Sequence, residues 1–287
     1  MRTARGAAAC RGILALVLAL VLATGTAFAT ENAASLFGIG ASARALGLGG
    51  AFCALADDEG AVFHNPAGLP ALEGLALSSL FVQHFGGVAY GTATLAIPYV
   101  GLSAFFLDSG PIPVDGGSIR YASQGLAASA GLPIGPAGVG LRWRFYRVSN
   151  PIRGEGWALD PALLIVVDGL RIGFLYEGAL SSPIVYESGT EETFEQALCL
   201  GAALTLEPGQ GVLWNAVFEA SGLFSPTASL AAGLEAWIGG LGARVGFDGQ
   251  GPTFGLSIRF TTLQIDWAYA SRSDLGDSHR VSLSLRF

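Results

Sequence analysis

Residues 139–146 read VGLRWRFY, a stretch in which apolar and polar side chains alternate. The odd positions are Val139, Leu141, Trp143 and Phe145, and the even positions are Gly140, Arg142, Arg144 and Tyr146. Successive side chains of a β-strand point to opposite faces, so this period of two indicates a strand. Arginine is costly in hydrocarbon, so Arg142 and Arg144 are expected to face inward while Trp143 faces lipid. The stretch therefore predicts one strand of a transmembrane β-barrel.

The same alternation recurs along the chain. Four further apolar faces are Leu241, Ala243, Val245 and Phe247; Phe254, Leu256, Ile258 and Phe260; Leu263, Ile265, Trp267 and Tyr269; and Val281, Leu283, Leu285 and Phe287. Runs of about 9–11 residues suit tilted strands that cross a bilayer. A soluble β-sandwich also alternates, but aromatic residues near the segment ends fit the girdles of a membrane barrel.

These runs predict an all-β fold, an antiparallel transmembrane β-barrel of about fourteen strands over residues 73–287. The predicted strands are 74–84, 87–97, 99–108, 120–133, 137–149, 156–167, 169–180, 194–206, 211–221, 226–238, 241–249, 252–260, 262–272 and 278–287. Short connections alternate with longer ones at 109–119, 150–155, 181–193 and 273–277. We interpret the short ones as periplasmic turns and the long ones as extracellular loops.

The composition also indicates contact with lipid. Only 13% of the residues are charged, 51% are hydrophobic and the mean hydropathy is +0.52, whereas about a quarter of the residues of a soluble domain are charged. The most apolar internal segment, 157–180, is interrupted by charges and does not predict a transmembrane helix.

The first 29 residues predict a secretory signal peptide. Arg2, Arg5 and Arg11 precede the apolar run 12–23, and the sequence Ala-Phe-Ala follows at 27–29. The alternative is an uncleaved anchor, but the apolar run is short for a span. Removal of residues 1–29 leaves 12 arginines against 22 acidic residues, a net charge of −10. That charge argues against a nucleic-acid partner.

The C-terminal strand resembles the signal that the barrel assembly machinery of the outer membrane reads. It places Leu283, Leu285 and Phe287 on one face, and the chain ends on Phe287. Together with the signal peptide, this predicts a protein of the bacterial cell outer membrane, with outer-membrane lipid and the assembly machinery as partners.

Charged residues on the inward faces have both signs. They are Arg142, Arg144, Asp160, Arg171, Glu177, Glu219, Glu235, Arg244, Asp248, Arg259, Asp266 and Arg280. Buried charges need partners, so we predict a lumen network centred on Arg142, Arg144, Asp160, Glu235, Arg244 and Asp266. An ion-selective pore would show a ring of one sign. Small and apolar inward positions either hold a hydrophobic ligand or pack against a plug.

Residues 30–72 do not alternate. Residues 40–69 read GASARALGLGGAFCALADDEGAVFHNPAGL. Asp57 or Asp58 is expected to cap a short helix that ends before Asn65-Pro66. A cation site at Asp57-Asp58-Glu59 is less favoured than a solvated turn or a cap. The histidines lack metal-ligand spacing, so no metal is predicted. Cys53 and Cys199 are expected to be free, buried thiols, although their pairing stays open.

This segment resembles the N-terminal signature of the FadL-like outer-membrane barrels, including their PorV-like branch. Leu48 stands where Met is usual, and His64 where an aromatic residue is frequent. The resemblance implies that residues 30–72 form a hatch inside the barrel. The hatch motif would comprise Asn65, Pro66, Ala67 and Gly68, with Asp57 and Asp58.

The resemblance implies passive transport of hydrophobic, fatty-acid-like small molecules across the outer membrane without a cofactor. The alternative is a PorV-like partner of protein secretion and surface attachment, of the type IX kind, which would bind a secreted protein. No Gly-x-Ser-x-Gly elbow is present. A barrel enzyme would need a site near His84 and His279, and we expect that the protein is not an enzyme.

Overall fold

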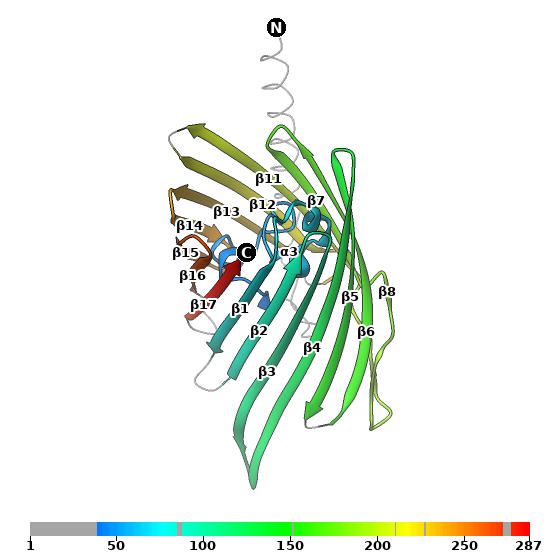
Figure 1. The fold of residues 1–287 in the computed structure, drawn as a ribbon. Coiled ribbons are helices and arrows are strands. Elements are labelled where there is room, and N and C mark those ends of the chain that lie inside the picture. Colours follow the sequence, from blue (N-terminus) through cyan, green and yellow to red (C-terminus); the bar gives the residue numbers. More distant parts are fainter. Residues whose placement is uncertain (1–38, 85–87, 151, 210, 227, 272–276) are drawn as a thin grey trace.

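The computed structural model describes residues 39–84, 88–150, 152–209, 211–226, 228–271 and 277–287. The predicted signal peptide and the start of the predicted hatch, residues 30–38, lie outside these ranges. The described chain forms one antiparallel sheet that closes on itself (Figure 1). Closure occurs because β1 (Ala76–His84) pairs both with β2 (Val88–Ile97) and with β17 (Ser278–Arg286).

Fourteen strands form the wall, as the alternation predicted. After β2 come β3 (Val100–Val114), β4 (Gly117–Ile134), β5 (Ala137–Asn150), β6 (Gly154–Val167), β7 (Leu170–Glu177), β11 (Ala197–Gly209), β12 (Val212–Leu223), β13 (Ser229–Ile238), β14 (Leu241–Phe247), β15 (Pro252–Arg259) and β16 (Leu263–Ala270). Each wall strand pairs with the next, and β7 pairs with β11. Every predicted strand therefore exists.

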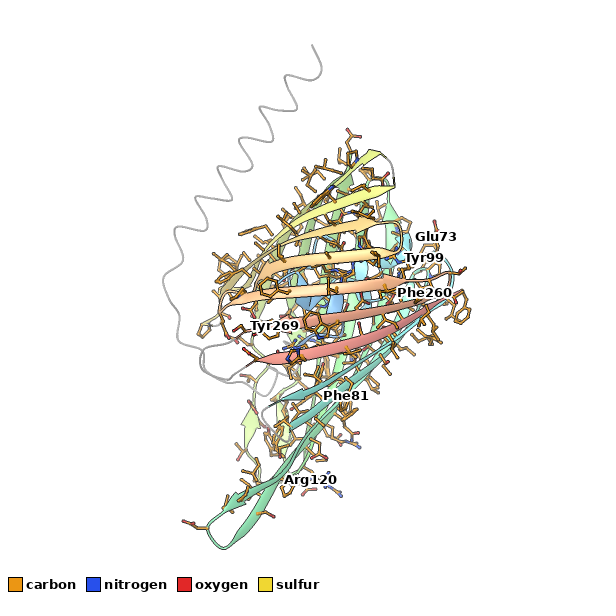
Figure 2. All side chains as sticks on the ribbon, turned by 90° about the vertical axis from the view of Figure 1, so that its left-hand side faces the viewer. Glu73, Phe81, Tyr99, Arg120, Phe260 and Tyr269 are labelled. Carbon is orange, nitrogen blue, oxygen red and sulfur yellow. The ribbon has the colours of Figure 1, made fainter. Side chains whose placement is uncertain are left out.

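Two predicted extracellular loops contain strands instead. Over 109–119, β3 and β4 continue as a hairpin, in which Ile112 faces Ile119. The hairpin extends past the rest of the barrel (Figures 1 and 2). Its Arg120 forms an ion pair with Asp108. The length of this connection predicted a loop, but a bulge after Asp108 absorbs the irregularity and pairing resumes.

The second predicted loop, 181–193, contains three short strands. They are β8 (Leu180–Ser181), β9 (Ile184–Tyr186) and β10 (Glu191–Glu192). β7 ends at Glu177, whereas β6 continues to Gly154, so β8 and β9 pair with the part of β6 that β7 leaves open.

The outer face of the barrel is apolar. On β15, Phe254, Leu256 and Ile258 are exposed while the residues between them are buried. Aromatic side chains lie toward both rims, with Tyr99 and Phe260 near one and Tyr269 near the other (Figure 2). An apolar band between aromatic girdles is the surface of a membrane-spanning barrel, and the protein belongs to the bacterial outer membrane. No helix in the described ranges is long and apolar enough to span a bilayer.

Residues 39–72 lie inside the barrel. They contain two short helices, α2 (Ala43–Gly47) and α3 (Ala61–His64), and the 3-10 helix η2 (Pro66–Ala71). α2 packs against β15 and β16, whereas η2 packs against β4 and β5 on another part of the wall. We call residues 39–72 the hatch segment below.

Candidate functional site in the barrel lumen

One arginine of the hatch segment joins it to the wall. Arg44 donates from Nε and Nη2 to both carboxylate oxygens of Glu235 on β13, at 2.8 and 2.7 Å. Its Nη1 also contacts Asp57 and Asp58, at 2.5 and 2.8 Å. Paired, two-pronged hydrogen bonds of this kind fix both distance and orientation. Arg44 is therefore held by three carboxylates, of which two belong to its own segment.

Glu235 is also bound from the wall side. It accepts hydrogen bonds from Arg244 Nε at 2.6 Å and from Asn215 Nδ2 at 2.7 Å. Glu235 and Arg244 are direct cross-strand partners on β13 and β14. Arg244 lies 3.5 Å from Asp266 and donates to Ser257 at 2.5 Å. We call this group, with Arg44, the first charge cluster.

A second charge cluster lies on β5, β6 and β7. Arg142 and Arg144 both form ion pairs with Asp160, at 2.8 and 2.6 Å. Arg142 also contacts Glu177 at 2.6 Å and donates to the carbonyl of Phe63 in the hatch segment. Asp160 is fully buried and also accepts from the Gly178 amide at 2.7 Å. This cluster too joins the wall to the hatch segment.

The six predicted network residues therefore all lie in the lumen but divide into two groups. Glu235, Arg244 and Asp266 belong to the first cluster, and Arg142, Arg144 and Asp160 to the second. Asp248, which was also predicted to face inward, lies in the turn after β14, where its carboxylate accepts from the amides of Gln250 and Gly251.

The expected helix cap by Asp57 or Asp58 was wrong. The residue before α3 is Gly60, and no side chain caps that helix. Asp58 is only 4% exposed and binds Arg44 rather than solvent. Although burial opposes its ionisation, the charges of Arg44 and Arg286 hold the pKa of Asp58 below its ordinary value. The two aspartates are thus partners of Arg44; Asp58 is buried, whereas the Asp57 side chain is 27% exposed.

Sequence reasoning missed two arginines that join the hatch segment to the wall. Arg44 gave no signal, because it stands in an alanine- and glycine-rich run without periodicity. Arg286 of β17 contacts Glu59 at 3.0 Å and so ties the last strand to the hatch segment. Its place on the polar face of β17, opposite Leu285 and Phe287, was the available signal.

The Asn65-Pro66-Ala67-Gly68 motif fixes a turn against the wall. Asn65 is fully buried; its Oδ1 accepts from the Ala67 amide at 3.0 Å, and its Nδ2 donates to the Cys53 carbonyl at 2.7 Å. Nδ2 also donates to the Leu163 carbonyl on β6 at 3.2 Å. The Asn65 amide therefore connects two parts of the hatch segment and one wall strand.

Glycines of the wall admit the backbone of the hatch segment. A Cβ atom at any of several inward positions would lie less than 3.0 Å from hatch backbone atoms. These positions are Gly131, Gly138 and Gly140 against the Asn-Pro-Ala turn, Gly173 and Gly201 against residues 53–54, and Gly233 and Gly246 against residues 48–49. The hatch segment is thus seated by close backbone approach as well as by charge.

An aromatic and aliphatic cluster lies in the lumen on the side of the long connections. Its buried members include Leu80, Val82, Tyr90, Phe105, Tyr146, Val148, Ile184 and Phe194. Tyr146 shares a 2.8 Å hydrogen bond with Tyr121, and Tyr90 donates to the Gly40 carbonyl. Ala41, Ala43 and Phe63 of the hatch segment belong to the same cluster. We call it the apolar lumen cluster; it adjoins both charge clusters through the hatch segment.

His64 and His279, the two histidines whose side chains the structure describes, lie at different places in the barrel. His64 packs edge-on against Phe52, and its buried Nε2 has no hydrogen-bond partner among the described residues. Burial and the positive charge of Arg142 lower the pKa of His64 to about 4. His279 is exposed on the outer face and stacks on Trp267. The side chain of His84 lies outside the described residues.

The geometry defines a plugged outer-membrane barrel. No family model and no curated protein matches the sequence. Among solved structures, the chain is similar to the CymD monoaromatic hydrocarbon channel, with 14% identity, a TM-score of 0.58 and coverage of 87% of this chain and 98% of that one. It is also similar to a deltaS2 mutant of the TodX monoaromatic hydrocarbon channel, with 14% identity, a TM-score of 0.50 and coverage of 88% and 99%. The protein therefore has the fold of the FadL-like outer-membrane barrels.

Proposed function

We propose that this barrel is an outer-membrane channel through which hydrophobic small molecules diffuse passively. The observation that carries the proposal is the apolar lumen cluster, which lines the side of the long connections with aromatic and aliphatic side chains. Such linings, with a few placed polar groups, are typical of sites for hydrophobic ligands. The two similar solved structures are described as hydrocarbon channels, which agrees with a solute of this kind.

The hatch segment controls passage in this proposal. It fills the lumen next to the apolar lumen cluster, and its contacts to the wall are ion pairs and close backbone packing. A solute that enters the apolar lumen cluster meets the two charge clusters, which offer it no favourable environment. Passage therefore requires that the hatch segment shift relative to the wall.

Uptake of a fluorescent fatty-acid analogue into proteoliposomes tests the channel. The Phe194→Gln substitution places a polar amide in the apolar lumen cluster, and we expect uptake to fall several-fold. Phe224→Gln is the matched control, because Phe224 is 90% exposed outside the lumen. Deletion of residues 30–72 should also change uptake. Unchanged uptake in both the deletion and Phe194→Gln would contradict the proposal.

A second candidate function is a PorV-like partner of protein secretion and surface attachment. The projecting hairpin of β3 and β4 favours it, because Ile112, Val114 and Ile119 are 41%, 43% and 52% exposed there. Exposed apolar side chains on a projecting ribbon suit protein binding. A secreted protein should co-purify with the wild type and not with the Ile112→Ser/Ile119→Ser variant. Absence of such a secretion system from the source genome would reject this candidate.

We also propose that the barrel has no catalytic activity. The site considered for a hydrolase needed His84 and His279 to converge with a serine, yet His279 stacks on Trp267 at the outer face. A lipid-hydrolase activity that is lost on replacement of both histidines would overturn this proposal.

A further inference from the structure

Two cysteines meet where the hatch segment touches the wall. Cys53 lies between α2 and α3, and Cys199 points inward from β11. Their Sγ atoms and a carboxylate oxygen of Glu219 on β12 all lie within 4.8 Å of one another. Both cysteines are free thiols and are buried, with exposures of 1% and 6%. They are the two cysteines that remain after the predicted signal peptide.

The backbone around Cys53 is held in place from several sides. Glu219 Oε2 accepts hydrogen bonds from the amides of Phe52 and Cys53, at 2.9 and 2.8 Å. The Cys53 carbonyl accepts from Asn65 Nδ2, and Gly173 and Gly201 let the backbone approach the wall. The short distance between the thiols is therefore built into the docked hatch segment.

The surroundings favour a neutral product over a metal centre. The buried cluster around the two cysteines is completed by Ala67, Ala162, Leu164 and Leu175. A divalent cation here would have three protein ligands, the two thiolates and the Glu219 carboxylate, whereas a closed structural zinc site has four. A disulfide needs no further ligand and adds no charge to this apolar cluster.

We propose that Cys53 and Cys199 are a disulfide-forming pair that covalently fastens the hatch segment to the barrel wall. The oxidant is a protein disulfide of the periplasm, a compartment in which disulfides form and persist. Two S–H bonds break and one Sγ–Sγ bond forms. Two electrons and two protons pass to the oxidant, whose disulfide is reduced to two thiols.

The bond adds a fixed point that neither charge cluster provides. Arg44 holds the hatch segment toward β13, and Arg142 holds it toward β5 and β6. Cys199 lies on β11, between these two parts of the wall. In the oxidised protein, the middle of the hatch segment therefore stays attached to the wall even when the ion pairs of both charge clusters are broken.

Peptide mapping of the full chain, purified from outer membranes, tests the bond. Free thiols are first blocked with N-ethylmaleimide in denaturant, and the chain is then digested with trypsin. Cys53 and Cys199 fall in peptides 45–120 and 172–244, each with a single cysteine. We expect the two peptides to be linked and to separate on reduction. The link should be absent from Cys53→Ser and Cys199→Ser.

Two results would overturn the proposal. One is that N-ethylmaleimide labels both cysteines without prior reduction. This labelling would have to be found both in protein from the oxidising compartment and after the folded barrel is treated with oxidised glutathione. The other is one equivalent of zinc bound per chain and lost from Cys199→Ser. The double variant Cys53→Ala/Cys199→Ala controls for folding, because it removes the pair without leaving a single thiol.

Discussion

Glu235→Gln should loosen the hatch segment without unfolding the barrel. Glu235 is fully buried and accepts two hydrogen bonds from Arg44, one from Arg244 and one from Asn215. Breaking a buried ion pair by removing one partner costs about 3–5 kcal/mol. Arg44 keeps Asp57 and Asp58, so we take the lower limit. If the free energy of opening the hatch segment falls by about 3 kcal/mol, the population of the open state rises roughly 100-fold.

Trypsin reports that opening directly. Arg44 is the only arginine between residues 30 and 119, and the chain has no lysine, so cleavage there yields a fragment that begins at Ala45. Cleavage follows the population of the open state when opening and closing are fast. We expect cleavage at Arg44 to be roughly 100-fold faster in Glu235→Gln, from the free-energy difference above.

The matched control for this experiment is Glu155→Gln. Glu155 pairs with Arg147 at 2.5 Å, but the two side chains are 51% and 47% exposed. Exposed pairs contribute about 1 kcal/mol at most, so cleavage at Arg44 should hardly change. Equal cleavage rates in wild type and Glu235→Gln would refute the view that the first charge cluster holds the hatch segment.

Three further outcomes follow from the same contacts. Gly140→Ala should destabilise the docked hatch segment by about 1–3 kcal/mol through overpacking, measured as faster trypsin cleavage in the hatch segment, whereas Gly117→Ala, with no atom near its Cβ position, should have no such effect. Leu256→Arg should cost about 2–4 kcal/mol of folding free energy in lipid vesicles, because Leu256 faces hydrocarbon. Ile119→Arg on the projecting hairpin is the control, because Ile119 is exposed to a similar extent. Equal costs would contradict the placement of Leu256 in the lipid-facing band and of Ile119 outside it. The pKa of His64 is about 4 in the folded protein and about 6.5 unfolded, so the unfolded state binds more protons and stability should fall by up to about 3 kcal/mol as pH drops from 6.5 to 4. His64→Gln should remove that part of the pH dependence in denaturant titrations, and an unchanged difference between pH 6.5 and 4 would show that the residue does not titrate this way.

The strands were predictable because the bilayer imposes a simple rule on them. A residue of the wall faces either hydrocarbon or the lumen, so the period of two in VGLRWRFY shows both the strand and the inward side of Arg142 and Arg144. The sequence predicted that Arg142 has an acidic partner but not that this partner is Asp160. The partner depends on the register between β5 and β6, which neither strand determines alone.

No such rule applies to the hatch segment, so the contacts of its residues could not be predicted. The acidic run at Asp57 has the composition of a solvated turn. It becomes the partner of Arg44 only because a closed sheet surrounds both, and closure is a property of the whole chain. The hairpin beyond Asp108 was missed because strands of about the length that crosses a bilayer were expected, whereas the pairing of β3 with β4 continues past a bulge and beyond that length.

The glycines of the wall tie the sequence of the barrel to the path of the hatch segment. They stand on strands from β4 to β14 and bring the wall into contact with the hatch backbone over much of its circumference. A Cβ atom at any of them would lie less than 3.0 Å from hatch backbone atoms. A substitution at one of these wall positions is therefore expected to act on the hatch segment as much as on the strand that carries it.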